Sequence, residues 1–191
     1  DLLSANDKFL RFQAKRVLDN LNTNQRVIYE KINSYLDKYI KFSGYENDDI
    51  SVIYKNFIKD YTDDCKKFLK TGLYPIELNT NQRVLKREDY DLVLIISCLL
   101  TNHRFKIIEE IMSFNHYGDH SLFIGVGSGL EIYLLEGKIK NFSAYDISIS
   151  NFAKTKFNKY IYEELYEFKE ERQYNDIFAI ELLEHIKNPY D

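Results

Sequence analysis

Residues 121–131 read Ser-Leu-Phe-Ile-Gly-Val-Gly-Ser-Gly-Leu-Glu, a short apolar run that leads into three glycines at alternate positions. We expect a strand to end at Gly125 and a helix to begin near Gly129. Glycine lets the backbone turn sharply and approach a ligand, because it has no Cβ atom to clash. The stretch therefore predicts a turn in an α/β sheet that binds a nucleotide-like cofactor.

An acidic residue follows at the distance that such a turn requires. A second apolar segment, residues 141–146, ends at Asp146, about 20 residues beyond the first glycine. A carboxylate there can accept hydrogen bonds from ribose hydroxyls. The dinucleotide fingerprint Gly-x-Gly-x-x-Gly is not met, because its last position is Leu130 and the third glycine comes one residue earlier.

The spacing Gly-x-Gly-x-Gly resembles that of class I S-adenosylmethionine-dependent methyltransferases. Residues 174–189 add a second match, Tyr-Asn-Asp-Ile-Phe-Ala-Ile-Glu-Leu-Leu-Glu-His-Ile-Lys-Asn-Pro. This stretch is similar to the fourth strand and following helix of the small-molecule members of that family, and the motifs come in the family's order. The resemblance implies a Rossmann-like parallel sheet, S-adenosylmethionine as cofactor, and methyl transfer to a small-molecule acceptor.

The resemblance also implies roles for individual residues. Asp146 would bind the ribose, Ile147 would pack on the adenine, and Glu181 would contact the cofactor where it meets the substrate. His185 is the candidate general base, since imidazole titrates near neutral pH. The complete set of cofactor-binding residues implied in this way is Gly125, Val126, Gly127, Gly129, Asp146, Ile147 and Glu181.

One position departs from the family. Its members usually carry an acid two residues before the first glycine, where it helps to order the methionine end of the cofactor, and this chain has Phe123. Nicotianamine-synthase-like enzymes resemble methyltransferases, often lack that acid, carry a helical domain in front, and transfer the aminobutyrate portion of the cofactor. Their loop usually continues with a proline, absent from residues 130–135, and Glu184-His185 favours the methyltransferase branch. Aminobutyrate transfer and a non-catalytic cofactor-binding or scaffold module remain alternatives.

Other polar residues near these motifs have two interpretations each. Glu131 either caps the helix after the glycines or approaches the methionine end of the cofactor. Arg104 either binds a carboxylate of the cofactor or substrate or is a surface cation. His116 and His120 have a spacing that metal sites use, but Gly118 between them argues against the helix that would align them, so we expect no metal site.

Composition limits the classes of function. A hydrophobic content of 45% supports a packed globule, and a net charge of −4 argues against a broad nucleic-acid interface. The longest apolar run, residues 92–100, is far shorter than the ~18–20 residues that span a bilayer. Cys65 and Cys98 lack paired or metal-ligand spacing. We expect a cytoplasmic protein without nucleic-acid or membrane partners, with a homodimer as an open alternative.

The pattern of apolar residues divides the chain into two parts. Residues 1–115 carry helical stripes and predict a helical N-terminal domain or lid, with residues 87–114 forming one helix or two. Residues 116–191 predict a partial S-adenosylmethionine-binding Rossmann-like domain that supplies about four of the family's seven strands, with the glycine-loop strand central and parallel to its neighbours. The strands are expected near 121–125, 142–146, 160–165 and 176–180, and the helices near 129–137, 149–159 and 181–187.

Overall fold

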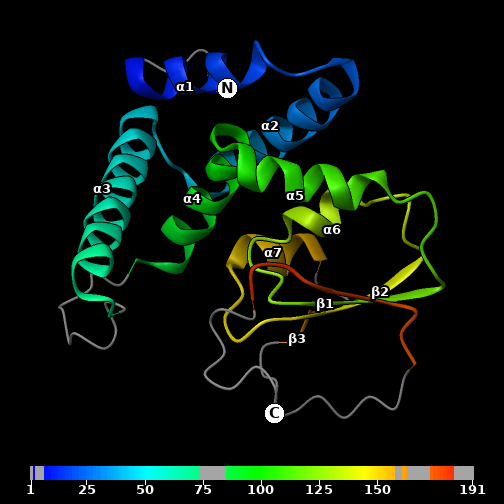
Figure 1. Ribbon diagram of the computed structural model, residues 1–191. Coiled ribbons are helices and arrows are strands. Elements are labelled where there is room, and N and C mark those ends of the chain that lie inside the picture. Colours follow the sequence, from blue (N-terminus) through cyan, green and yellow to red (C-terminus); the bar gives the residue numbers. More distant parts are fainter. Residues whose placement is uncertain (1, 3–6, 74–84, 158–160, 163–172, 183–191) are drawn as a thin grey trace.

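The computed structural model describes residues 2, 7–73, 85–157, 161–162 and 173–182. In this part of the chain five helices precede the first strand, after which short strands and helices alternate (Figure 1). The elements are α1 Lys8–Leu18, α2 Thr23–Ser43, α3 Asn47–Thr71, α4 Arg87–Leu100, α5 Asn102–Ser113, β1 His120–Ile124, α6 Leu130–Leu134, β2 Asn141–Tyr145, α7 Asn151–Phe157, β3 Ile161–Tyr162 and β4 Asp176–Ala179.

Local chemistry sets the ends of the longer helices. Helix α2 begins after Asn22, whose side chain accepts from the Gln25 amide while the Gln25 side chain accepts from the Asn22 amide. This reciprocal pair satisfies two amides that the first turn leaves without partners. The N-cap of this helix is therefore Asn22. The helix ends at Gly44, which has a φ of 72°.

Residues 87–114 form two helices because the chain is extended at Thr101. Its φ and ψ are −123° and 133°, and it both ends α4 and begins α5. The Thr101 hydroxyl donates to the carbonyl of Ser97 at 2.8 Å, which satisfies an acceptor of the last turn of α4. Thr101 thus turns the chain between two helices that pack against each other.

The four strands that the structure describes are all parallel and have the order β3-β2-β1-β4. Phe123 of β1 lies opposite Ala144 of β2 on one side and Phe178 of β4 on the other. The glycine-loop strand is therefore central between the other two predicted strands, which confirms that expectation. The mixed α/β class with an N-terminal helical region is also confirmed.

Helices α5, α6 and α7 lie along one face of the sheet (Figure 1). Ile111 of α5, Ile132 of α6 and Ala153 of α7 belong to one buried cluster with the strand residues Phe123 and Ala144. Phe123 stacks on Phe178 with ring centroids 4.5 Å apart, so this side chain points into the core beneath the helices. A core phenylalanine therefore lies at the position where the methyltransferase family that the sequence resembles usually carries an acid.

Strand β4 is less buried than its apolar sequence predicts. Ile177 is 64% exposed, whereas Phe178 is partly buried in the cluster beneath the helices. In the described part of the sheet β4 is an edge strand, and successive side chains point to opposite faces. The side chain of Ile177 consequently points away from the face that α5, α6 and α7 cover.

Three predicted elements differ in extent from the observed ones. Helix α6 covers only Leu130–Leu134 of the predicted 129–137, α7 covers Asn151–Phe157 of 149–159, and β3 is described only at Ile161–Tyr162. The helix predicted over 181–187 does not begin at 181, because Glu181 has a φ of 48° and Leu182 is not helical. The remainder of that segment, including His185, lies outside the described residues.

The helical layer and the sheet region share one hydrophobic core. Leu130 and Leu134 of α6 and Phe152 of α7 are buried in the same cluster as the interior residues of α1–α5. The ring of Phe152 packs edge-on against Tyr39 of α2 with centroids 5.1 Å apart. Among the described helices, none combines the length and apolar character needed to cross a bilayer.

Candidate functional site

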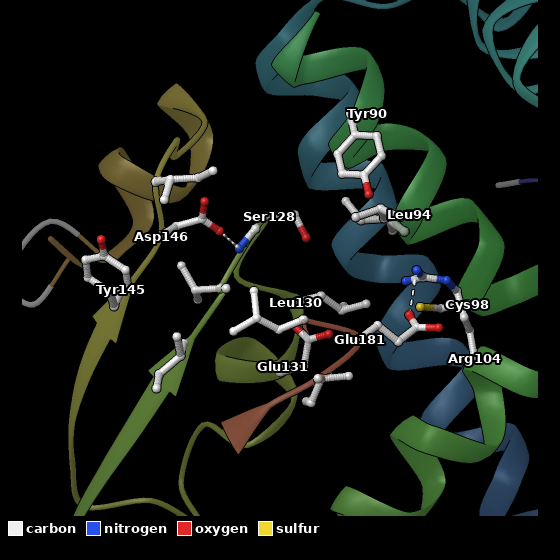
Figure 2. A pocket seen from close by; sticks show the side chains of 18 of the residues that line it. Tyr90, Leu94, Cys98, Arg104, Ser128, Leu130, Glu131, Tyr145, Asp146 and Glu181 are labelled. Carbon is white, nitrogen blue, oxygen red and sulfur yellow. Dashed lines mark hydrogen bonds and ion pairs between the residues drawn. The ribbon is translucent and has the colours of Figure 1, made fainter. Parts of the chain in front are cut away.

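A cavity of about 430 Å³ lies at the carboxyl ends of β1, β2 and β4 and is closed on its other side by helices α4 and α5 (Figure 2). The sheet contributes the turn after β1, the end of β2 and the residues that follow β4. Helix α4 contributes a stripe of side chains at steps of three and four. The lining residues used below are Gly125, Val126, Gly127, Ser128, Glu131, Asp146, Ile147 and Glu181 from the sheet region, and Arg87, Tyr90, Leu94, Cys98 and Arg104 from the helical layer.

The order of the strands explains why a cavity forms here. The chain passes from β1 to β2 and β3 on one side, and then returns to place β4 on the other side of β1. Connections that leave a central strand in opposite directions open a crevice at its carboxyl end, which is where open parallel sheets bind ligands. Gly125 and Glu181, which follow β1 and β4, both line this crevice.

The three glycines after β1 form a turn that other residues could adopt only with strain. Gly125, Gly127 and Gly129 have φ values of 72°, 54° and 79°. A Cβ atom at Gly127 would lie 3.3 Å from a guanidinium nitrogen of Arg87, and one at Gly129 would lie 2.5 Å from the Phe157 ring. The turn thus needs glycine both for its dihedral angles and for the close approach of neighbouring side chains.

Asp146 holds this turn in place. Its Oδ2 accepts a hydrogen bond from the Gly127 amide at 2.7 Å, and its Oδ1 accepts one from the Ser148 amide at 2.9 Å. The residue is 6% exposed and lines the cavity. An ionised carboxylate can accept about four hydrogen bonds, so each oxygen retains capacity for a ligand hydroxyl.

An apolar surface lies beside Asp146. Ile147 is 82% exposed and contributes to the cavity wall, an uncommon exposure for a large aliphatic side chain. Val126 also contributes to the wall but is 4% exposed and packs mainly in the cluster beneath the helices. This end of the cavity therefore combines hydrogen-bond acceptors with an apolar edge.

The helix-side end of the cavity is charged. The Arg104 guanidinium lies 2.5 Å from Glu181 Oε2, and His103 Nε2 lies 3.4 Å from Glu181 Oε1. Glu131 projects into the same region from the first turn of α6, where its side chain accepts a hydrogen bond from its own backbone amide. Burial raises the pKa of Glu131, and the charge of Glu181 acts in the same direction while Arg104 opposes both.

A second ion pair connects α4 to the glycine turn. A guanidinium nitrogen of Arg87 lies 2.9 Å from Asp91 Oδ1 and 3.9 Å from Asp146 Oδ2. Asp91 is fully buried, and this burial raises its pKa to about 6 although Arg87 and the Ser150 hydroxyl lower it. Arg87 thus lies between one carboxylate inside the helical layer and one in the cavity.

The helical layer also contacts the glycine turn directly. The hydroxyl of Tyr35, a buried residue of α2, donates to the carbonyl of Ser128 at 2.6 Å. Cys98 lines the cavity but is 3% exposed, and burial raises the pKa of its thiol to about 12. This thiol is therefore uncharged near neutral pH and acts as part of the cavity wall.

The structure brings most of the predicted site residues together. Gly125, Val126, Gly127, Asp146, Ile147 and Glu181 all line the cavity. Gly129 is not a lining residue and instead is the N-cap of α6, while His185 lies outside the described residues.

Apart from Arg104, sequence reasoning did not identify the helix-side wall. Arg87, Tyr90, Leu94 and Cys98 recur at helical spacing, and in a sequence this pattern is the same as that of a stripe that faces a hydrophobic core. Comparisons with protein-family models, with curated proteins and with solved structures find no match. The geometry of the cavity is therefore the basis for the proposal that follows.

Proposed function

We propose that this protein binds S-adenosylmethionine in the cavity and transfers the methyl group to a small-molecule acceptor. The observation that carries the proposal is the hydrogen bond from the Gly127 amide to Asp146 at the crevice between β1, β2 and β4. This contact links a glycine turn to an acid that ends the neighbouring strand. The same combination positions a ribose in other parallel α/β sheets.

The two ends of the cavity suit different parts of this cofactor. Asp146 would accept hydrogen bonds from the ribose hydroxyls, and Ile147 would pack on the adenine. The glycine turn lets the backbone approach the ligand, and Glu131, Glu181 and Arg104 face the opposite end. When bound, S-adenosylmethionine supplies an activated methyl group on its sulfonium, so the protein has mainly to orient the acceptor and exclude water.

Aminobutyrate transfer from the same cofactor is a second candidate, and the environment of Phe123 favours it. That side chain is 2% exposed and stacked in the core, so no acid lies at the position that orders the methionine end in methyltransferases. Product analysis separates the two reactions. Methyl transfer yields S-adenosylhomocysteine, whereas aminobutyrate transfer yields methylthioadenosine.

Calorimetric titration with S-adenosylmethionine and S-adenosylhomocysteine tests the proposal. Asp146→Ala should weaken binding roughly tenfold to hundredfold, because each charge-assisted hydrogen bond contributes about 1.5–3 kcal/mol. Asp119→Ala is the matched control. Asp119 is exposed, does not line the cavity, and pairs with Lys140 at an N–O distance of 2.5 Å. A folded Asp146→Ala variant with unchanged affinity would refute Asp146 as the ribose anchor.

Turnover distinguishes an enzyme from a binding module. If S-adenosylmethionine binds but is never consumed in the presence of candidate small-molecule acceptors, the non-catalytic alternative replaces the transferase. A cytoplasmic location belongs to the same proposal, as does the expectation that the partner is a small molecule. A homodimer stays an alternative that sedimentation measurements test.

A further inference from the structure

The second half of helix α3 carries large apolar side chains that the described part of the chain leaves exposed. In the first half of the helix, Ile50 and Tyr54 are buried in the core of the helical layer. Farther along, Tyr61 is 61% exposed and Leu69 is 83% exposed. Figure 1 shows α3 on the side of the helical layer remote from the sheet, with its second half directed away from α1. Large apolar residues that gather on one exposed surface are typical of an interaction site.

These residues belong to one row along the surface of α3. Residues four apart on a helix lie next to each other on the same face, and such rows form the ridges by which helices pack. The first two members of the row stack with ring centroids 6.3 Å apart. A second helix is the occupant that such a ridge suits, because its own rows fit into the grooves beside it. The row, called the α3 ridge below, consists of Phe57, Tyr61, Cys65 and Leu69.

The charged residues of the same segment are arranged symmetrically about Cys65. Three acids precede Cys65 and three lysines follow it, and each acid is as far from Cys65 along the chain as one of the lysines. An antiparallel copy of the segment, centred on Cys65, therefore places a lysine at the level of every acid, whereas a parallel copy places like charges at the same level. The matched pairs are Asp64 with Lys66, Asp63 with Lys67, and Asp60 with Lys70.

Within one chain these charges have weak partners. Lys66 lies 3.2 Å from Asp63, and Lys67 lies 3.3 Å from Asp64, each pair three residues apart on α3. The side chains of Lys66 and Lys67 are 71% and 47% exposed, and exposed pairs of this kind contribute little to stability. They can therefore be exchanged for contacts with a second chain at little cost.

We propose that the second half of α3 binds the same segment of a second copy of this chain, in antiparallel orientation and centred on Cys65. The two α3 ridges pack against each other, with Cys65 at the two-fold axis and Tyr61 of each copy near Leu69 of the other. A two-fold contact of this kind closes on itself and yields a dimer. Because one helix face is a small interface, the dimer is weak, with a dissociation constant on the order of 10 µM. None of these residues lines the cavity, so the inference does not depend on the proposed function.

Sedimentation velocity of the wild-type chain tests the association itself. The dimer fraction should rise between about 1 and 100 µM protein. Tyr61→Ser and Leu69→Ser should each weaken the dimer roughly tenfold or more, because the two-fold axis makes each substitution count twice. Val52→Ser is the matched control, since Val52 is 57% exposed on α3 but lies outside the ridge, and it should leave the association unchanged. A wild-type chain that is still monomeric at roughly 100 µM overturns the inference.

Two charge-reversed chains test the antiparallel pairing. In the basic chain Asp60, Asp63 and Asp64 are replaced by lysine, and in the acidic chain Lys66, Lys67 and Lys70 are replaced by glutamate. Each chain alone should be monomeric, because like charges then lie at the same level in either orientation. An equimolar mixture should form heterodimers at least as tight as the wild-type dimer. A mixture that associates no more tightly than either chain alone contradicts the pairing, and circular dichroism of each chain verifies that α3 is retained.

Cross-linking tests the centre of the contact. Cys98 is 3% exposed, so a short bismaleimide reacts mainly with Cys65, the other cysteine of the chain. The wild-type chain should give a covalent dimer, and Cys65→Ser should give none. Cys65→Ser combined with Val52→Cys is the control for position, because residue 52 is far from the two-fold axis in this register. A yield from position 52 that equals the yield from Cys65 overturns the proposed contact.

Discussion

Two buried aspartates lie on either side of Arg87, and they are stabilised differently. Asp146 directly follows β2 and receives two backbone N–H groups, from Gly127 and Ser148. Asp91 lies inside the helical layer with the Arg87 guanidinium at 2.9 Å, and its burial raises its pKa to about 6. Backbone donors in a turn can replace water around a carboxylate, whereas the Arg87 guanidinium and the Ser150 hydroxyl only partly offset the desolvation of Asp91.

The different surroundings of the two aspartates have a consequence for function. Asp146 is held by the turn that it orders, so it can present its remaining lone pairs to a ligand. Asp91 is not a lining residue of the cavity and acts through Arg87, which is one. We therefore expect changes at Arg87 and Asp91 to alter mainly the stability of the fold, and changes in the glycine turn to alter mainly the binding site.

Removal of the Arg87 guanidinium should have the largest effect on stability. Arg87→Ala leaves Asp91 buried without its cation, and breaking a buried pair in this way costs about 3–5 kcal/mol. Chemical denaturation at pH 7 should show this loss, and Lys106→Ala, an exposed cation of α5, should show almost none. Adding Asp91→Asn to Arg87→Ala should recover much of the loss. A double variant as unstable as the single one would mean that Asp91 is not the cause.

The pH dependence of unfolding provides the second test. Because the folded-state pKa of Asp91 is raised from 3.8 to about 6, the folded protein binds more protons than the unfolded chain between these values. The free energy of unfolding should therefore fall as the pH rises from about 4 to about 6, by up to roughly 3 kcal/mol from this group. Subtracting the curve of Asp91→Asn isolates the contribution, and a flat difference curve would contradict the assignment.

The two aspartates also show what could be predicted from the sequence. Asp146 was predictable because glycine spacing and an acid at the end of the next apolar segment form a local pattern with a known physical role. Asp91 and Arg87 were not, because a charged pair four residues apart on a helix usually lies at the surface. Only the packing of α4 against other helices buries this pair.

The elements of the sheet region also divide into features that local motifs predict and features that depend on packing. The order and direction of β1, β2 and β4 followed from their motifs, while the exposed face of β4 depends on which strands and helices surround it. The backbone of Glu181, with its φ of 48°, could not be anticipated from an apolar run followed by a helix-like pattern. Residues that tertiary contacts position were therefore the ones that sequence periodicity misassigned.

A substitution at Gly129 tests whether the turn tolerates any side chain. Gly129→Ala should destabilise the fold by about 1–3 kcal/mol, because the residue has a φ of 79° and a Cβ atom would lie 2.5 Å from the Phe157 ring. Gly137→Ala is the matched control, since Gly137 has a φ of 86° but no neighbour within 4 Å of its Cβ position. Equal losses in the two variants would show that the dihedral angle alone accounts for the effect.

The smallest expected effect on stability concerns the contact between the helical layer and the turn. Tyr35→Phe removes the hydrogen bond from the Tyr35 hydroxyl to the Ser128 carbonyl and should cost about 1 kcal/mol. Tyr39→Phe is a close control, because Tyr39 is a buried tyrosine of the same helix whose hydroxyl donates to the Glu88 carbonyl at 2.9 Å.

If Tyr35 positions the glycine turn, the two variants should lose similar stability but differ at the site. Hydrogen exchange at the amides of residues 125–129 should then accelerate in Tyr35→Phe alone, and affinity for S-adenosylhomocysteine should fall in that variant alone. Equal exchange in both variants would mean that Asp146 is sufficient to order the turn. In that case the helical layer would contribute the wall of the cavity but not the conformation of its floor.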